Sequence, residues 1–304
     1  MNLVVGASGV LGSRVVARLL ERGERVRAVT RDPARLSGPG WSDVETVRGD
    51  MLERDWMPAA LEGVRHVVIA AHGLVPPSRR NTPAAVDGDG ARALIDAAAS
   101  GAVRRVVHMS VAGAEREANA FARVKRATER HLMASGVPWT VLRPSAFPEN
   151  HALLLMGEPL RAGKPVPFFG KGTEAINWVS ADDVAEDVVR VLADESTVGT
   201  VREVRGPDRM SRRDALELLE RHLGVSAKRQ HLPLPLVKVV HAGARLFHPG
   251  VAYLVGMALD EIARGGDPEV EDATWRGTTR VEDVIARWAD GAVATADPVS
   301  ARQG

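Results

Sequence analysis

Three glycines spaced three residues apart, Gly6, Gly9 and Gly12, stand near the start of the chain and could bind an anion. An apolar run at residues 3–5 precedes them, and apolar residues then recur at helical spacing as far as residue 19. This pattern predicts a strand, a glycine turn and a helix. Backbone N–H groups at the start of such a helix can hold a pyrophosphate, so the expected ligand is a dinucleotide.

The roles expected of the three glycines differ. Gly6 and Gly9 would let the backbone pass close beneath the pyrophosphate, and Gly12 would let the helix pack tightly against its strand. The spacing is G-x-x-G-x-x-G, looser than the G-x-G-x-x-G of many dehydrogenases, so an ordinary strand-to-helix turn is the alternative. The candidate dinucleotide ligands in this turn are Gly6, Ala7, Ser8, Gly9, Val10, Leu11 and Gly12.

A second strand is expected at residues 26–30, and the residues after it indicate which dinucleotide binds. A site for NAD usually has an acidic side chain here, roughly 20 residues beyond the glycines, to bind the ribose 2′-hydroxyl. This chain has Arg31 after Thr30, with Arg35 nearby. A guanidinium can pair with a 2′-phosphate, which favours NADPH over NADH. The alternative is that both arginines are solvated on a surface loop.

Further strands and helices are expected to alternate along the first half of the chain. The strands lie at residues 44–47, 66–71, 105–110 and 139–142, and the helices at 91–99 and 121–135. This alternation predicts an α/β fold, a doubly wound parallel sheet of the Rossmann type with right-handed crossovers.

Side chains at the carboxyl ends of parallel strands face the ligand crevice, which adds candidates to the dinucleotide site. For Asp50, an N-cap role for the helix that contains Leu61 is an equally good interpretation. His72 is expected to be a solvated loop residue. The added candidates are Asp50, Met51, Ala70, Ala71, Pro144, Ser145 and Phe147.

The βα alternation weakens beyond residue 150, which predicts a second, smaller lobe. We expect a dinucleotide-binding core at residues 1–150 with return segments near 176–204, a mainly substrate-binding and mostly helical lobe at 151–290, and a flexible tail at 291–304. Within the lobe, a turn is expected at 168–172, strands at 176–179 and 201–204, and helices at 181–193, 211–223 and 279–289. The apolar stretch at 233–263 is expected to form two helices divided at His248, buried or lid-forming and too short to cross a bilayer.

The composition is that of a globular protein with balanced charge. Hydrophobic residues make up 45% of the 304 residues, enough for one large core or a core with an appended lobe. Lys and Arg number 40 against 39 Asp and Glu, so a nucleic-acid partner has no support. The chain has no cysteine and no His, Asp or Glu at metal-ligand spacing, so no metal site is expected. No secretory pattern is present, and a cytoplasmic monomer or homodimer without membrane contact is expected.

These motifs resemble the extended, atypical branch of the short-chain dehydrogenase/reductases, most closely the NmrA-like group of NADPH-binding proteins. The matching stretches cover most of residues 1–189 in the right order, and the resemblance is thin beyond residue 204. They are VVGASGVLG at 4–12, TRDPARL at 30–36, GDM at 49–51, AVDGDGARALIDAA at 85–98, VVHMSVAGA at 106–114, KRATERHLMASGVPWTVLRPSAF at 125–147 and NWVSADDVAEDVV at 177–189.

The resemblance implies a Tyr-x-x-x-Lys pair on the helix after the fifth strand, four residues apart and therefore on one face. In the family the tyrosine exchanges a proton with the substrate oxygen, and the lysine binds the nicotinamide ribose and lowers the tyrosine pKa. Here Lys125 is present, but Phe121 stands in place of the tyrosine. A phenyl ring has no proton to exchange, so acid–base chemistry from this position is impossible.

The remaining catalytic candidates are few. The serine that the family places just beyond the fifth strand corresponds here to Ser110, which falls at the strand end and is expected to be structural. Ser145 lies where the nicotinamide is expected, and His151 follows it, while Tyr253, the single tyrosine, lies in the apolar helices. Each of these three has an ordinary loop or packing role as its alternative.

Two functions are compatible with a lysine that has no tyrosine partner. In the first, the protein is an NADPH-dependent reductase of an aromatic or polyketide-type ketone or a quinone, since such an acceptor stabilises its own developing charge and water or the substrate can supply the proton. The apolar helices would then form a pocket wall. In the second, catalysis is lost and the protein senses NADPH, as NmrA-like regulators are thought to do. The retained Lys125 favours the enzyme.

Overall fold

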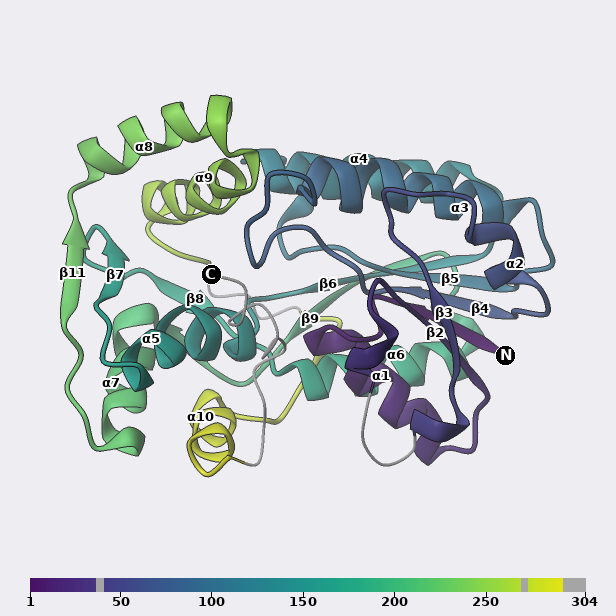
Figure 1. The fold of residues 1–304 in the computed structure, drawn as a ribbon, viewed down its shortest axis with the longest axis horizontal. Helices are drawn as coiled ribbons and strands as arrows, with labels where there is room; N and C mark the ends of the chain where they lie inside the picture. Colours follow the sequence, from purple (N-terminus) through teal and green to yellow (C-terminus); the bar gives the residue numbers. More distant parts are fainter. Residues whose placement is uncertain (37–40, 269–272, 292–304) are drawn as a thin grey trace.

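The computed structural model describes residues 1–36, 41–268 and 273–291 and has an eight-stranded parallel sheet at its centre (Figure 1). The strand order is β12-β9-β6-β5-β4-β1-β2-β3. This confirms the predicted Rossmann-type α/β fold. The strands are β1 (Asn2–Val5), β2 (Val26–Thr30), β3 (Glu45–Arg48), β4 (His66–Ile69), β5 (Arg105–Met109), β6 (Trp139–Pro144), β9 (Thr200–Arg205) and β12 (Trp275–Arg276).

The register of the central strands brings their carboxyl ends to one edge. Val5 at the end of β1 pairs with Val29 of β2 and Ile69 of β4. Ile69 in turn pairs with His108 of β5. The residues that follow these strands are therefore neighbours, and this edge is where open α/β sheets bind ligands. Strands β1 and β5 are buried along their whole length, as expected of a parallel sheet covered on both faces.

Helices cover both faces of the sheet. In Figure 1, α1 and α6 lie below the sheet, and α2, α3 and α4 lie above it. Their apolar faces form two separate cores with the strands, because side chains alternate across a sheet. The covering helices are α1 (Val10–Glu21), α2 (Met57–Leu61), α3 (Ala91–Ala99), α4 (Ala120–Ala134) and α6 (Ala181–Ala193).

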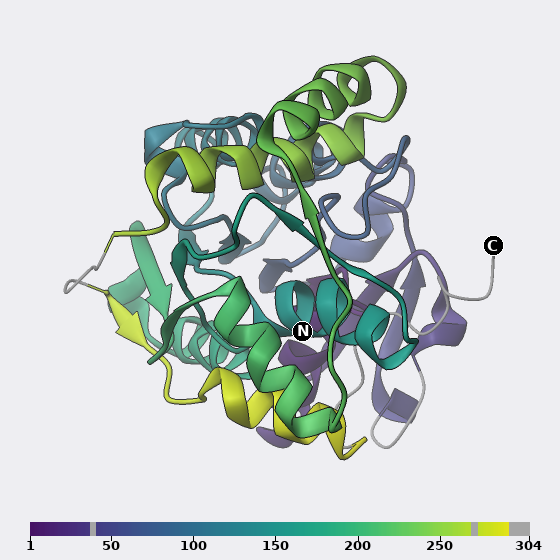
Figure 2. The same ribbon diagram turned by 90° about the vertical axis from the view of Figure 1, so that its left-hand side faces the viewer.

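The later part of the chain forms a third core beside the carboxyl edge of the sheet (Figures 1 and 2). It includes two small sheets, in which β10 pairs with β8 and β11 pairs with β7. Two π-helical segments, at Ala84–Gly90 and Glu149–Gly157, precede α3 and α5. The remaining elements are α5 (Glu158–Arg161), β7 (Val166–Phe169), β8 (Ala175–Asn177), β10 (Arg209–Ser211), α7 (Arg212–Leu223), β11 (Arg229–Leu232), α8 (Leu234–Phe247), α9 (Pro249–Arg264) and α10 (Val281–Ala289).

Several predictions about the later elements need correction. Phe168 and Phe169, expected in a turn, end strand β7, because β11 pairs with it in parallel. The strand expected at 176–179 is β8, which pairs with β10 and not with the main sheet. The predicted pair of helices divided at His248 is confirmed as α8 and α9. Within the described residues, no helix is long and apolar enough to cross a membrane. The predicted flexible tail lies outside the described residues apart from residue 291.

Candidate active site

The glycine turn between β1 and α1 has the close approaches that the sequence predicts. Gly6 has a φ of +87°, and a Cβ there would lie 2.7 Å from the backbone of Ala71. A Cβ on Gly12 would lie 2.1 Å from the carbonyl oxygen of Gly6, so only glycine lets α1 sit against the turn. A Cβ on Gly9 would meet only that same oxygen, at 3.2 Å. Gly9 is the N-cap of α1 and offers no side-chain cap, so the first N–H groups of the helix remain available to an anion.

One end of the cleft holds the residues predicted to select the dinucleotide. A cavity of about 130 Å³ runs from the glycine turn to Thr30, Arg31 and Arg35. Asp32 does not line this cavity, because its carboxylate accepts a hydrogen bond from the backbone N–H of Ala34 at 3.1 Å. The lining just after β2 is therefore cationic, through Arg31 and Arg35, and Asp32 contributes no carboxylate to it.

The other residues predicted at this end line the same cavity, but the alternative capping role of Asp50 is not observed. Asp50 and the buried Met51 line the cavity, as do Ala70 and Ala71. Asp50 does not cap the following helix, contrary to one interpretation, because its carboxylate accepts from the backbone N–H of Leu52 at 3.0 Å. The N-cap of α2 is Trp56.

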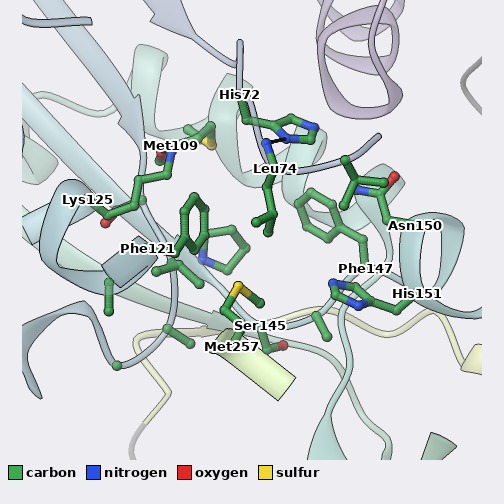
Figure 3. A pocket seen from close by; sticks show the side chains of 18 of the residues that line it. His72, Leu74, Met109, Phe121, Lys125, Ser145, Phe147, Asn150, His151 and Met257 are labelled. Atoms are coloured by element: carbon green, nitrogen blue, oxygen red, sulfur yellow. Dashed lines mark hydrogen bonds between the residues drawn. The ribbon is translucent and has the colours of Figure 1, made fainter. Parts of the chain in front are cut away.

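A second cavity, of about 190 Å³, continues the cleft along the carboxyl edge of the sheet (Figure 3). Gly9, Ala70, Ala71 and Asn150 line both cavities, so the two are consecutive parts of one cleft. We call this second space the central cavity. The predicted residues that line it are Gly9, Val10, Leu11, Ala70, Ala71, Ser110, Lys125, Pro144, Ser145 and Phe147.

Lys125 is almost completely buried in the wall of the central cavity, with 3% of its surface exposed. Its Nζ donates to the carbonyl oxygen of Met109 at 2.7 Å and lies 2.6 Å from a carboxylate oxygen of Asp87. Asp87 lies in the π-helical segment before α3, and its other carboxylate oxygen accepts from the backbone N–H of Gly73 at 2.8 Å. The pair fixes the lysine without a tyrosine and leaves an ammonium hydrogen for a ligand.

Phe121 lines the central cavity on the same face of α4 as Lys125. The Nζ of Lys125 lies 5.6 Å from the centre of the Phe121 ring. Figure 3 shows the ring directed into the cavity, with Phe147 and Met257 among the other side chains around the same space. The structure thus brings Phe121 to the position where the resemblance requires an acid, and there it supplies only an apolar surface.

Ser110 is engaged in a buried network that supports its structural interpretation. Its hydroxyl donates to the carboxylate of Glu129 at 2.5 Å. Arg143 donates to the same carboxylate at 2.9 and 2.7 Å. Burial raises the pKa of Glu129, but the hydrogen bonds from Arg143, Ser110 and Arg126 outweigh it and hold the pKa below its usual range. The serine proton is therefore committed to an ionised carboxylate and not to a substrate.

Ser145 lines the central cavity from the loop after β6, and Asn150 and His151 line it from the π-helical segment that follows. The Oγ of Ser145 is buried and has no hydrogen-bond partner. Burial, with help from the charge of Arg212, lowers the pKa of His151 to about 3, so the imidazole is neutral at physiological pH. Arg212 lies 3.2 Å from Nδ1 of His151, and because a guanidinium only donates, the imidazole proton is on Nε2.

Some of the predicted residues do not reach the cleft, and some cleft residues were missed. Ala7 and Gly12 line neither cavity, because both are packed beneath the turn. His72 is exposed, as expected, and also lines both cavities. Asp87 was missed, although an acidic residue at an inward position of an otherwise apolar helical face signals a buried pair. Arg212 was missed because it comes from α7, far along the chain.

Comparisons with known proteins agree with this site. A model of the NAD(P)H-binding family matches residues 6–195. The chain belongs to this family. A reductase of Streptomyces griseus, named for a (4-alkanoyl-5-oxo-2,5-dihydrofuran-3-yl)methyl phosphate, is 34% identical over 226 residues, 74% of each chain. An NAD(P)H azoreductase of Xenophilus azovorans is 30% identical over 212 residues, 69% of this chain and 70% of that one.

Other proteins of known structure share the fold of this chain. An NADPH-dependent quinone oxidoreductase of Escherichia coli, solved with NADPH, superposes with a TM-score of 0.73 at 22% identity, covering 95% of this chain and 99% of that one. A UDP-glucuronic acid 4-epimerase of Bacillus cereus, solved with NAD, superposes with a TM-score of 0.67 at 18% identity, over 95% and 97% of the two chains. The family and the two reductases among the relatives together support an NAD(P)H-dependent oxidoreductase.

Proposed function

We propose that this protein is an NADPH-dependent reductase of an aromatic or polyketide-type ketone or a quinone. The observation that carries the proposal is the position of Phe121, a phenyl ring in the wall of an otherwise suitable hydride-transfer site. A general acid contributes roughly 10²–10⁴-fold to such reactions. An acceptor that stabilises its own negative charge by conjugation loses least when that acid is missing.

In this proposal, the residues of the chain position the dinucleotide and the acceptor. The glycine turn and Arg31 hold the dinucleotide at one end, and Lys125, fixed by Asp87, binds the ribose at the other. The bound dinucleotide supplies the hydride. The neutral Nε2–H of His151 and the unpartnered hydroxyl of Ser145 can bind the oxygen of the acceptor, while water or the substrate supplies the proton.

Two of the relatives and the cavity favour an enzyme over a cofactor sensor. These two relatives are named for the reduction of an alkanoyl dihydrofuranone phosphate and of azo compounds. The central cavity gives a substrate room beside Lys125. A sensor needs the part of this cavity beside Lys125 for the dinucleotide, but not the part that extends to Met257 and Glu261 on α9.

The test of this function is the consumption of NADPH with a panel of quinones and aryl ketones, followed at roughly 340 nm, the band of reduced nicotinamide. We expect protein-dependent consumption with at least one class of acceptor. Tight NADPH binding without turnover across the panel would favour the sensor.

We also propose that Arg31 selects NADPH over NADH. Arg31→Ala should weaken NADPH at least about tenfold and leave NADH within about twofold, because a charge-assisted pair with the 2′-phosphate is lost. Dissociation constants from fluorescence titration with each dinucleotide measure this. Arg104→Ala, which removes the same charge from an exposed position outside the cavities, is the matched control. Equal losses of NADPH and NADH affinity in Arg31→Ala would overturn the assignment.

A further inference from the structure

A third cavity, of about 150 Å³, opens from the central cavity on the side away from the dinucleotide cleft. We call it the side cavity. It lies between α9, the π-helical segment after β6 and strand β7, and Gly172, Glu174 and Arg212 also line it. Its walls are formed mainly by apolar side chains, including Leu155, Met156, Phe168, Leu254, Met257 and Ile262. Its lining is apolar like that of a hydrophobic core, but no side chain of the described residues fills it.

The junction between the two cavities is polar but has its charges balanced. His151, Arg212, Met257 and Glu261 line both cavities. Arg212 forms a bidentate pair with Glu261, with nitrogen–oxygen distances of 3.2 and 2.7 Å. It also donates to the neutral His151. An apolar group that passes this junction therefore meets an internally paired guanidinium and carboxylate, so it strips no water from a lone charge.

We propose that the side cavity binds an apolar chain attached to the reducible ring of the substrate, an alkyl or isoprenoid substituent of about six carbons. This inference rests on the proposed function, because the ring would occupy the central cavity while the chain passes His151. A cavity of about 150 Å³ holds a group the size of benzene, which sets the length at about six carbons.

Burial of each methylene should strengthen binding about fourfold until the side cavity is full. Affinity should therefore rise with chain length and then level off. A rigid wall produces the plateau, since carbons beyond the cavity return to water. An acceptor whose ring alone is recognised would show no such dependence.

The experiment measures dissociation constants for one quinone ring carrying no chain, or a butyl, hexyl or decyl chain. Isothermal titration calorimetry with the NADP⁺-loaded protein keeps the measurement independent of turnover. Affinity is expected to increase at least about 100-fold from no chain to hexyl and to change less than about threefold from hexyl to decyl. In parallel, kcat/KM for NADPH oxidation should follow the same order.

Two variants on α9 locate the effect. Ala258 lines the side cavity but not the central one, so Ala258→Trp should abolish the dependence on chain length and leave the chainless quinone within about threefold. Ile262→Phe, a smaller change in the same wall, should reduce the dependence if Ala258→Trp fails to fold. Ala263→Trp, at an exposed position of the same helix, is the matched control and should retain the dependence.

The outcomes separate this inference from the proposed function. Equal affinities across the series in the native protein would overturn the inference, even if every quinone is reduced. A dependence that survives Ala258→Trp and Ile262→Phe would also overturn it, by placing the chain elsewhere. Chain-dependent binding without any NADPH consumption would support the side cavity as a binding site and contradict the reductase.

Discussion

Lys125→Met should lower the free energy of unfolding by about 3–5 kcal/mol, because it leaves the carboxylate of Asp87 buried without its cation. The two side chains are 3% and 0% exposed, so water cannot replace the lost partner. The backbone N–H of Gly73 still donates to Asp87, but one neutral donor does not balance a buried charge. Urea unfolding followed by circular dichroism measures the change.

A double variant distinguishes this buried pair from a general role of the lysine in the fold. Asp87→Asn with Lys125→Met removes both charges and should recover about half of the lost stability. Lys164→Met, at an exposed position, should change the free energy of unfolding by less than about 0.5 kcal/mol. If Lys125→Met proved no more destabilising than Lys164→Met, the pair of Lys125 with Asp87 would not stabilise the fold as its geometry indicates. The double variant should still bind NADPH more weakly, since its lysine is missing.

Gly12→Ala and Gly9→Ala change the same turn, but the first should mainly lower stability and the second should mainly lower NADPH affinity. A Cβ on Gly12 would lie 2.1 Å from the carbonyl oxygen of Gly6, so α1 must move away from the sheet. We expect a loss of about 3 kcal/mol in stability. On Gly9 the new methyl group meets only one atom, at 3.2 Å, and otherwise enters the cleft. Stability should change by less than about 1 kcal/mol, while NADPH affinity falls at least about tenfold.

Thermal unfolding and NADPH titration of both variants make the comparison. Gly101→Ala, where the nearest atom to the new Cβ would lie at 3.7 Å, is the control and should alter neither quantity. Equal destabilisation by Gly9→Ala and Gly12→Ala would show that the turn tolerates no side chain anywhere. Normal NADPH binding by Gly9→Ala would remove the glycine turn from the cofactor site.

The sequence was informative where function depends on short segments. The glycine turn, Arg31 and the Phe121–Lys125 spacing each lie within one element or one connection, and local patterns report such elements directly. The parallel arrangement of the main strands was predicted from their alternation with helices, because parallel strands need crossovers.

The remaining features depend on contacts between distant segments. The carboxylate of Asp87 meets Lys125 only because the π-helical segment before α3 packs on α4, and neither sequence stretch specifies the other. The side cavity is formed by Phe168, Leu254 and Leu155, which come from a strand, a helix and a π-helical segment. Phe168 was expected in a turn because the glycines after it dominate the local pattern, while its pairing with β11 is non-local.

The most direct test of the central claim is a single-turnover measurement with the protein in excess over NADPH and a quinone or aryl ketone present. The account predicts that the absorbance of protein-bound NADPH decays in one phase, and that deuterium at the transferred position of the nicotinamide slows this decay. It also predicts that Phe121→Tyr changes the rate less than about tenfold, below the usual contribution of a general acid. Bound NADPH whose absorbance persists with every acceptor would contradict the claim that this cleft carries out reduction.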